Sequence, residues 1–202
     1  MDPTLRSRAL RLSYFTVGYN MLEGILSITA GLFAGSVALV GFGLDSFVES
    51  LSGSIMIWRF SEHKVFTPEE EARREAKAVR LIGWAFLILG AYVGYESVEK
   101  LISREIPEKS LVGIFIAVAS ILIMPVLTYQ KYRVGKLIDS RSLVADSKQT
   151  LACVFLSVAL LAGLGLNYLY DFWWADPIVG LMIVLFVIKE GYEALKEEKL
   201  CC

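Results

Sequence analysis

The chain has 202 residues, of which 55% are hydrophobic, and its formal net charge is −1. A mean hydropathy of +0.56 is too apolar for an ordinary soluble domain, and the near-neutral charge gives no electrostatic basis for binding nucleic acid. The first apolar segment lacks a clear small-residue cleavage site, so we interpret it as a membrane helix rather than a signal peptide. The three cysteines form no disulfide framework.

Six segments are long and apolar enough to cross the membrane, since a helix needs about 20 residues to span about 30 Å of hydrocarbon. In chain order they are 12–33, 37–58, 81–102, 111–129, 144–169 and 175–194. The connections 34–36 and 170–174 are so short that the helices they join must be antiparallel neighbours. The sequence predicts an all-α integral membrane protein, with one six-helix transmembrane domain over 1–202 and no cytoplasmic C-terminal domain.

Basic residues indicate the orientation of these helices. Most lie in four groups that the predicted topology places on one side, at 6–11, 59–80, 131–148 and 189–199. The other side receives only Lys100, Arg104 and Lys109. By the positive-inside rule, both termini are cytoplasmic. Trp173 and Trp174 then fall at the opposite interface, where indole rings are common.

Two connections contain signals for helix starts. Asp176 and Pro177 are typical of the N-cap and first turn of a helix, which predicts that Asp176 caps the sixth helix. In the charged segment 61–79, Thr67 precedes Pro and three Glu residues, so a cytoplasmic extension of the third helix is expected. His63, the only histidine, is interpreted as an ordinary surface residue.

Two acids stand inside the second predicted span. Asp45 and Glu49 are four residues apart, so they share one face of the helix. Each carboxylate in hydrocarbon costs roughly 2.5–3.5 kcal/mol on insertion scales, so the pair indicates a place that holds a metal ion or protons. Glu23 lies at a comparable depth, about 16 Å into the first span at 1.5 Å per residue. It is either part of this layer or a structural partner for a polar group such as Asn20.

The fifth predicted span begins with a polar stripe, because Asp146, Gln149 and Cys153 are spaced by three and four residues. A thiolate favours zinc-like ions, whereas oxygen ligands suit harder ions such as manganese. Structural alternatives remain: Asp146 can cap the helix, Gln149 can bond a neighbouring helix, and Cys153 can be a small hydrophobic residue. Asp146, Gln149 and Cys153 are therefore possible metal ligands, together with Asp45, Glu49 and Glu23.

Three motifs give the chain a family resemblance. They are Gly35-Ser-Val-Ala-Leu-Val-Gly-Phe-Gly-Leu-Asp-Ser, Ser142-Leu-Val-Ala-Asp-Ser-Lys-Gln-Thr and Trp174-Ala-Asp-Pro. With these motifs, nearly the whole chain resembles the membrane domain of the cation diffusion facilitator family, the zinc, manganese and iron efflux proteins. The resemblance implies a tetrahedral metal site formed by Asp45, Glu49, Gln149 and Cys153, with Asp146 and Glu23 as accessory candidates. On the fifth helix, Gln149 and Cys153 replace the expected His and Asp, which removes the imidazole that usually favours zinc.

The resemblance implies a secondary transporter that exports divalent, zinc-like cations from the cytoplasm in exchange for protons. When the ion leaves, the buried carboxylates need another positive partner, and protons can serve. The alternative is a non-transporting membrane scaffold or metal sensor, which the missing His and the missing cytoplasmic domain favour.

Several expectations accompany this function. The protein is not expected to be an enzyme or to hold a cofactor, since no phosphate loop or nucleophile motif is present and the metal is cargo. We expect partners in the lipid bilayer, divalent metal ions and protons, a homodimer formed through the membrane helices, and a bacterial inner or plasma membrane location. Cys201 and Cys202 are interpreted as idle cytosolic thiols.

Overall fold

The computed structural model describes residues 3–61, 68–104 and 107–197. Regular structure in these ranges is entirely helical, as predicted. The helices are α1 (Pro3–Ala34), α2 (Val37–Ser61), α3 (Pro68–Ser103), α4 (Leu111–Leu137), α5 (Arg141–Tyr170) and α6 (Ala175–Glu197). Several extend beyond the predicted apolar segments, because charged residues at their ends continue the helix outside the stretch that hydropathy marks. The predictions for His63, Thr67, Cys201 and Cys202 lie outside the described residues.

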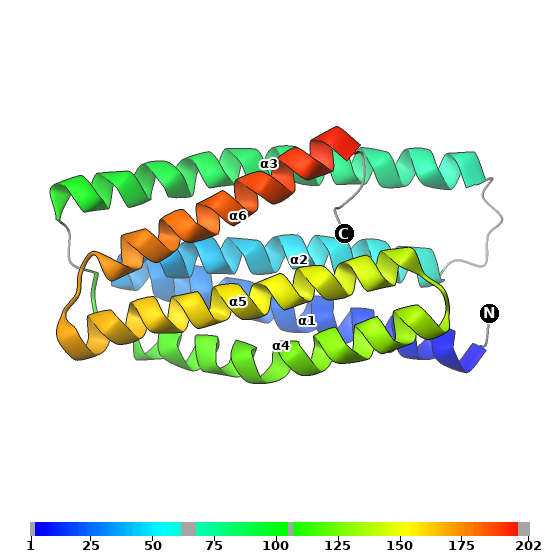
Figure 1. Ribbon diagram of the computed structural model, residues 1–202, viewed down its shortest axis with the longest axis horizontal. Coiled ribbons are helices and arrows are strands. Elements are labelled where there is room, and N and C mark those ends of the chain that lie inside the picture. The colour runs from blue at the N-terminus through cyan, green and yellow to red at the C-terminus, as the bar shows by residue number, and fades with distance from the viewer. Residues whose placement is uncertain (1–2, 62–67, 105–106, 198–202) are drawn as a thin grey trace.

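Four helices form a bundle, and the other two pair beside it. Helices α1, α2, α4 and α5 pack together, whereas α3 lies alongside α6 on one side of them (Figure 1). The closest pairs are α1 with α2, α3 with α6, and α4 with α5. Helix α1 begins and α6 ends toward the right of Figure 1, so the described ends of the chain point the same way.

Apolar side chains cover the outside of this bundle. Phe33 is 83% exposed, Phe115 73% and Leu185 72%, which suits hydrocarbon rather than water as the surrounding medium. Three helices of the described part, α1, α4 and α5, contain stretches long and apolar enough to cross a membrane. These features support an integral membrane protein, while the count of six spans and the cytoplasmic termini remain predictions.

Glycines let α1 and α2 approach closely. A Cβ on Gly43 would lie 2.9 Å from the carbonyl oxygen of Gly24, and a Cβ on Gly24 would lie 2.9 Å from that of Gly43. Gly43 therefore serves close packing between the two helices. The close approach brings Glu23 of α1 within hydrogen-bond distance of Ser46 of α2.

The link between α1 and α2 is held by side chains from α3 and α6. Gly35 adopts a φ of +61°, and its carbonyl oxygen accepts a hydrogen bond from Lys100 Nζ at 2.5 Å. The Asp176 carboxylate accepts hydrogen bonds from Ser36 Oγ and from the backbone N–H of Val37. The prediction that Asp176 caps its own helix is therefore wrong. Asp176 stands in the first turn of α6 and caps α2, whose N-terminal amides carry the partial positive charge that attracts a carboxylate.

Candidate metal site in the helix bundle

A fully buried lysine lies between three helices of the bundle. Lys131 of α4 is 0% exposed, and its Nζ lies 2.9 Å from Asp146 Oδ2 of α5 and 3.8 Å from Glu49 Oε1 of α2. Thr150 of α5 accepts a hydrogen bond from Lys131 at 2.9 Å and donates one to Glu49 Oε1 at 2.5 Å. We call Lys131, Asp146, Glu49 and Thr150 the lysine cluster. In this cluster, one ammonium group faces two carboxylates.

Sequence reasoning assigned Lys131 to the cytoplasmic group of basic residues, because the predicted span ended at 129. Helix α4 continues to Leu137 and carries Lys131 into the interior. A signal was present in the sequence, since Met124 and Leu127 stand seven and four residues before Lys131, on the same helical face. Both are buried, and Lys131 continues their stripe.

The capping alternative for Asp146 is wrong. Helix α5 begins at Arg141, and Ser140 provides its N-cap by accepting a hydrogen bond from the backbone N–H of Leu143 at 3.4 Å. Asp146 stands more than one turn inside the helix. Besides its ion pair with Lys131, its Oδ1 accepts a hydrogen bond from Ser52 Oγ of α2 at 3.1 Å. Asp146 therefore joins α5 to α2 and α4.

Glu23 belongs to a second polar group, between α1 and α2. Its side chain is 4% exposed and accepts hydrogen bonds from Tyr19 Oη at 3.0 Å and from Ser46 Oγ at 2.9 Å. Asn20, the partner considered for Glu23, lies near Glu49 instead. Asn20 is fully buried, and neither of its amide atoms has a hydrogen-bond partner of normal geometry among the described residues.

The predicted ligands lie in the interior without closing around a single point. Asp45, Glu49 and Cys153 are buried, and Gln149 is half-buried. The Cys153 thiol is within electrostatic range of Glu49, Asp45 and Glu23. Within the ranges given above, however, no three Asp, Glu, His or Cys side chains are close enough to hold one metal ion. The structure thus brings these residues toward one layer but does not gather them into a coordination sphere.

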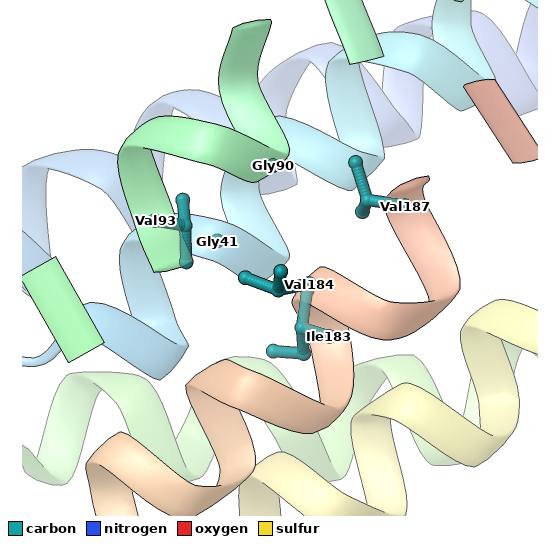
Figure 2. A pocket seen from close by; sticks show the side chains of 6 residues that line it. All are labelled: Gly41, Gly90, Val93, Ile183, Val184 and Val187. Atoms are coloured by element: carbon teal, nitrogen blue, oxygen red, sulfur yellow. The ribbon is translucent and has the colours of Figure 1, made fainter. Parts of the chain in front are cut away.

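A small cavity between α2, α3 and α6 is separate from this layer (Figure 2). Its volume of about 10 Å³ is near the minimum that holds one water molecule. The residues that line it are all apolar: Gly41, Gly90, Val93, Ile183, Val184 and Val187. It therefore offers no ligand for a cation.

Apolar outer faces together with buried acids from α1, α2 and α5 define a helical membrane protein with a charged interior. Comparison with known proteins identifies its family. The family model described as the cation efflux transmembrane domain matches residues 14–200. The chain therefore belongs to the cation efflux family, as the three sequence motifs indicated, and this membership supports metal cation transport.

Relatives in several organisms agree with this assignment. The chain is 24% identical over 193 residues to transmembrane protein 163 of Xenopus laevis, covering 95% of this chain and 68% of that protein. It is 27% identical over 176 residues to an uncharacterized transporter of Synechocystis, covering 85% and 57%. It is 24% identical over 178 residues to the cation-efflux pump FieF of Shewanella oneidensis, covering 83% and 58%.

The chain spans between 57% and 68% of the length of these three relatives. Because an animal protein is among them, the bacterial inner membrane remains a prediction for the location of this protein.

Proposed function

We propose that this protein is a secondary transporter that moves divalent transition-metal cations across the membrane in exchange for protons. The observation that carries the proposal is the hydrogen bonding of the buried Glu49 carboxylate. Its Oε1 is bonded to Thr150, whereas its Oε2 is buried and forms no hydrogen bond of normal geometry among the described residues, with Asn20 and Cys153 as its polar neighbours. An unsatisfied buried acceptor costs roughly 1–3 kcal/mol, more when charged. A bound cation would remove this penalty.

The residues around Glu49 suit a transition metal. Asp45 adds a second carboxylate, and Cys153 adds sulfur, which favours a borderline ion such as zinc over a hard one. Gln149 would serve as a weak oxygen ligand or as a hydrogen-bond donor to a ligand. Binding would require these side chains to close around the ion, as expected of a site that must also release its cargo.

Proton exchange follows from the cost of bare charge in hydrocarbon. When the metal leaves, the positive charge that it placed beside Asp45 and Glu49 must be replaced, and protons can do this together with Lys131, whose Nζ lies 3.8 Å from Glu49. Metal binding would then release protons, so a proton gradient could drive metal movement. Export from the cytoplasm is the direction that the family resemblance implies.

Flux measurements in proteoliposomes test the proposal. With zinc, manganese or cadmium and an imposed pH gradient, the wild-type protein should show metal flux coupled to proton movement. Glu49→Gln should lose about tenfold or more of this flux, equivalent to about 1.4 kcal/mol. The matched control is Glu99→Gln, which removes the same charge from an exposed position on α3 and should retain the flux.

Two other results would contradict the proposal. Metal binding without flux, unaffected by the pH gradient, would favour a non-transporting scaffold or sensor. Failure of the folded wild-type protein to bind any of the three metals would remove the metal site itself.

A further inference from the structure

We propose that Lys131 is a built-in competitor of the transported metal: its ammonium group holds Glu49 in the metal-free protein and releases it when a divalent ion binds. This inference rests on the proposed function, since it concerns the same carboxylate. It assigns Lys131 the role of a positioning residue that sets metal affinity, and it makes Asp146 the anchor of that lysine rather than a metal ligand.

The contacts of Lys131 are asymmetric. Its ion pair with Asp146 is close, at 2.9 Å, whereas the distance to Glu49 is 3.8 Å. Asp146 is also fixed from α2, because its other carboxylate oxygen accepts the hydrogen bond from Ser52. The second carboxylate oxygen of Glu49 forms no hydrogen bond of normal geometry within the described part of the chain. A metal ion can therefore bind Glu49 while the ammonium group of Lys131 stays paired with Asp146.

The lysine cluster lies toward one end of the bundle. Ser52 stands one turn beyond Glu49 toward the end of α2, and Asp146 lies in the second turn of α5. Lys131 lies near the end of α4. The cluster is thus nearer than Asp45 and Cys153 to the end of the bundle where α5 begins, which is the cytoplasmic end in the predicted topology.

Electrostatics favour a divalent ion over a monovalent ion in the competition with Lys131 for Glu49. A fixed ammonium group in a medium of low dielectric constant repels other cations and stabilises the carboxylates that it faces. A divalent ion brings twice the charge of the ammonium group to Glu49, so it can displace the lysine where a monovalent ion does not. Lys131 would thereby lower metal affinity, favour release, and disfavour monovalent cations.

Removing the ammonium group should strengthen metal binding. In Lys131→Met, Glu49 and Asp146 would face each other without a cation, so the metal-free state would rise in free energy more than the bound state. We expect zinc and manganese to bind roughly tenfold more tightly, equivalent to about 1.4 kcal/mol. Lys131→Arg, which keeps the charge, should bind like the wild type. Lys136→Met removes an exposed lysine from the same helix and is the matched control.

A double variant separates competition from a purely structural role. Asp146→Asn should weaken metal binding, because Lys131 loses its anchor and pairs with Glu49 alone. Adding Lys131→Met to Asp146→Asn should restore wild-type affinity or exceed it, and this pair of changes removes one charge of each sign. If Asp146 were itself a metal ligand, the double variant would stay weak, and the proposed anchor role would be wrong.

The experiment is calorimetric titration of the purified full chain with zinc and manganese at a fixed, mildly alkaline pH, with the melting temperature of each variant measured alongside. If Lys131→Met fails to fold, the comparison of the double variant with Asp146→Asn tests the competitor role instead. Unchanged or weaker binding in folded Lys131→Met contradicts the competitor role alone. A wild-type protein that binds neither metal contradicts the proposed function and the competitor role together.

Discussion

The backbone N–H of Val37 donates a hydrogen bond to Asp176 Oδ2 at 2.9 Å, so the first turn of α6 caps the first residue of α2. Ser36 donates to the other oxygen of the same carboxylate. The preceding residue, Gly35, is bonded to Lys100 of α3. Hydrogen bonds at the α1–α2 link therefore connect the α3 and α6 pair to the four-helix bundle.

Asp176→Ala should lower stability by about 1–3 kcal/mol, because it removes a helix cap and leaves the buried N–H of Val37 and the O–H of Ser36 without an acceptor. Thermal unfolding in detergent measures the effect. The control is Glu108→Ala: Glu108 is exposed, and its backbone N–H bonds to Ala34, so it lies at the same end of the bundle. Equal shifts in the melting temperature of the two variants would show that the cap has no special role.

Gly43→Ala should destabilise the protein by about 1–3 kcal/mol, as overpacking of a tight contact does. The added methyl group would lie 2.8 Å from Ile28 Cγ1 and 2.9 Å from the Gly24 carbonyl oxygen. Gly18→Ala on α1 is the control, since a Cβ there meets nothing within 4 Å. It should be neutral or slightly stabilising, because Ala is the better helix former. Similar losses in both variants would argue against close α1–α2 packing.

Hydropathy predicted the helices because lipid demands long apolar segments, and the predicted ends at 33, 37, 102, 111, 169 and 175 lie within one residue of the observed ends. The other predicted ends, at 12, 58, 81, 129, 144 and 194, fall 3 to 13 residues short of the observed ones. The ends are set by capping and by charged residues that continue a helix without contributing apolar length. The start of α5 illustrates this, since Ser140 fixes it and places Asp146 inside the helix. For the same reason, Lys131 belongs to the interior although it follows the apolar stretch of α4.

Spacing within one helix predicted that Asp45 and Glu49 share a face, and both side chains are buried in the structure. Contacts between helices could not be predicted in the same way, because they depend on how each helix is rotated and tilted. The pairing of Lys131 with Asp146 and that of Ser46 with Glu23 are of this kind. The sequence offered the residue types but not the partners.

Cys153→Ser should change metal preference rather than abolish binding. Replacing sulfur with a hydroxyl removes the ligand that suits zinc and cadmium but does little to the oxygen ligands that suit manganese. We expect zinc affinity to fall about tenfold or more, equivalent to at least about 1.4 kcal/mol, with manganese affinity nearly unchanged. Competition titrations with both metals on the same preparation provide an internal control. If zinc and manganese affinities are both unchanged, Cys153 is a small packing residue and not a ligand.

Glu23→Gln should weaken metal binding although Glu23 is not among the four predicted ligands. The substitution keeps the size of the side chain, and the hydroxyls of Tyr19 and Ser46 can rotate to bond the amide. At a mildly alkaline pH, it removes one negative charge from the neighbourhood of Glu49 and Cys153. At an effective dielectric constant near 20, such a charge contributes on the order of 1 kcal/mol, or about fivefold in affinity.

Tyr19→Phe is the matched variant for Glu23→Gln, because it removes a hydrogen bond to the same carboxylate while leaving the charge. If the charge of Glu23 attracts the metal, the metal affinity of Tyr19→Phe should stay within about twofold of the wild type. Such a change is well below the tenfold change that corresponds to about 1.4 kcal/mol. Calorimetric titration of both variants with the same metal makes the comparison. Equal losses in the two variants would instead make Glu23 a structural residue that contributes only through its bonds to Tyr19 and Ser46.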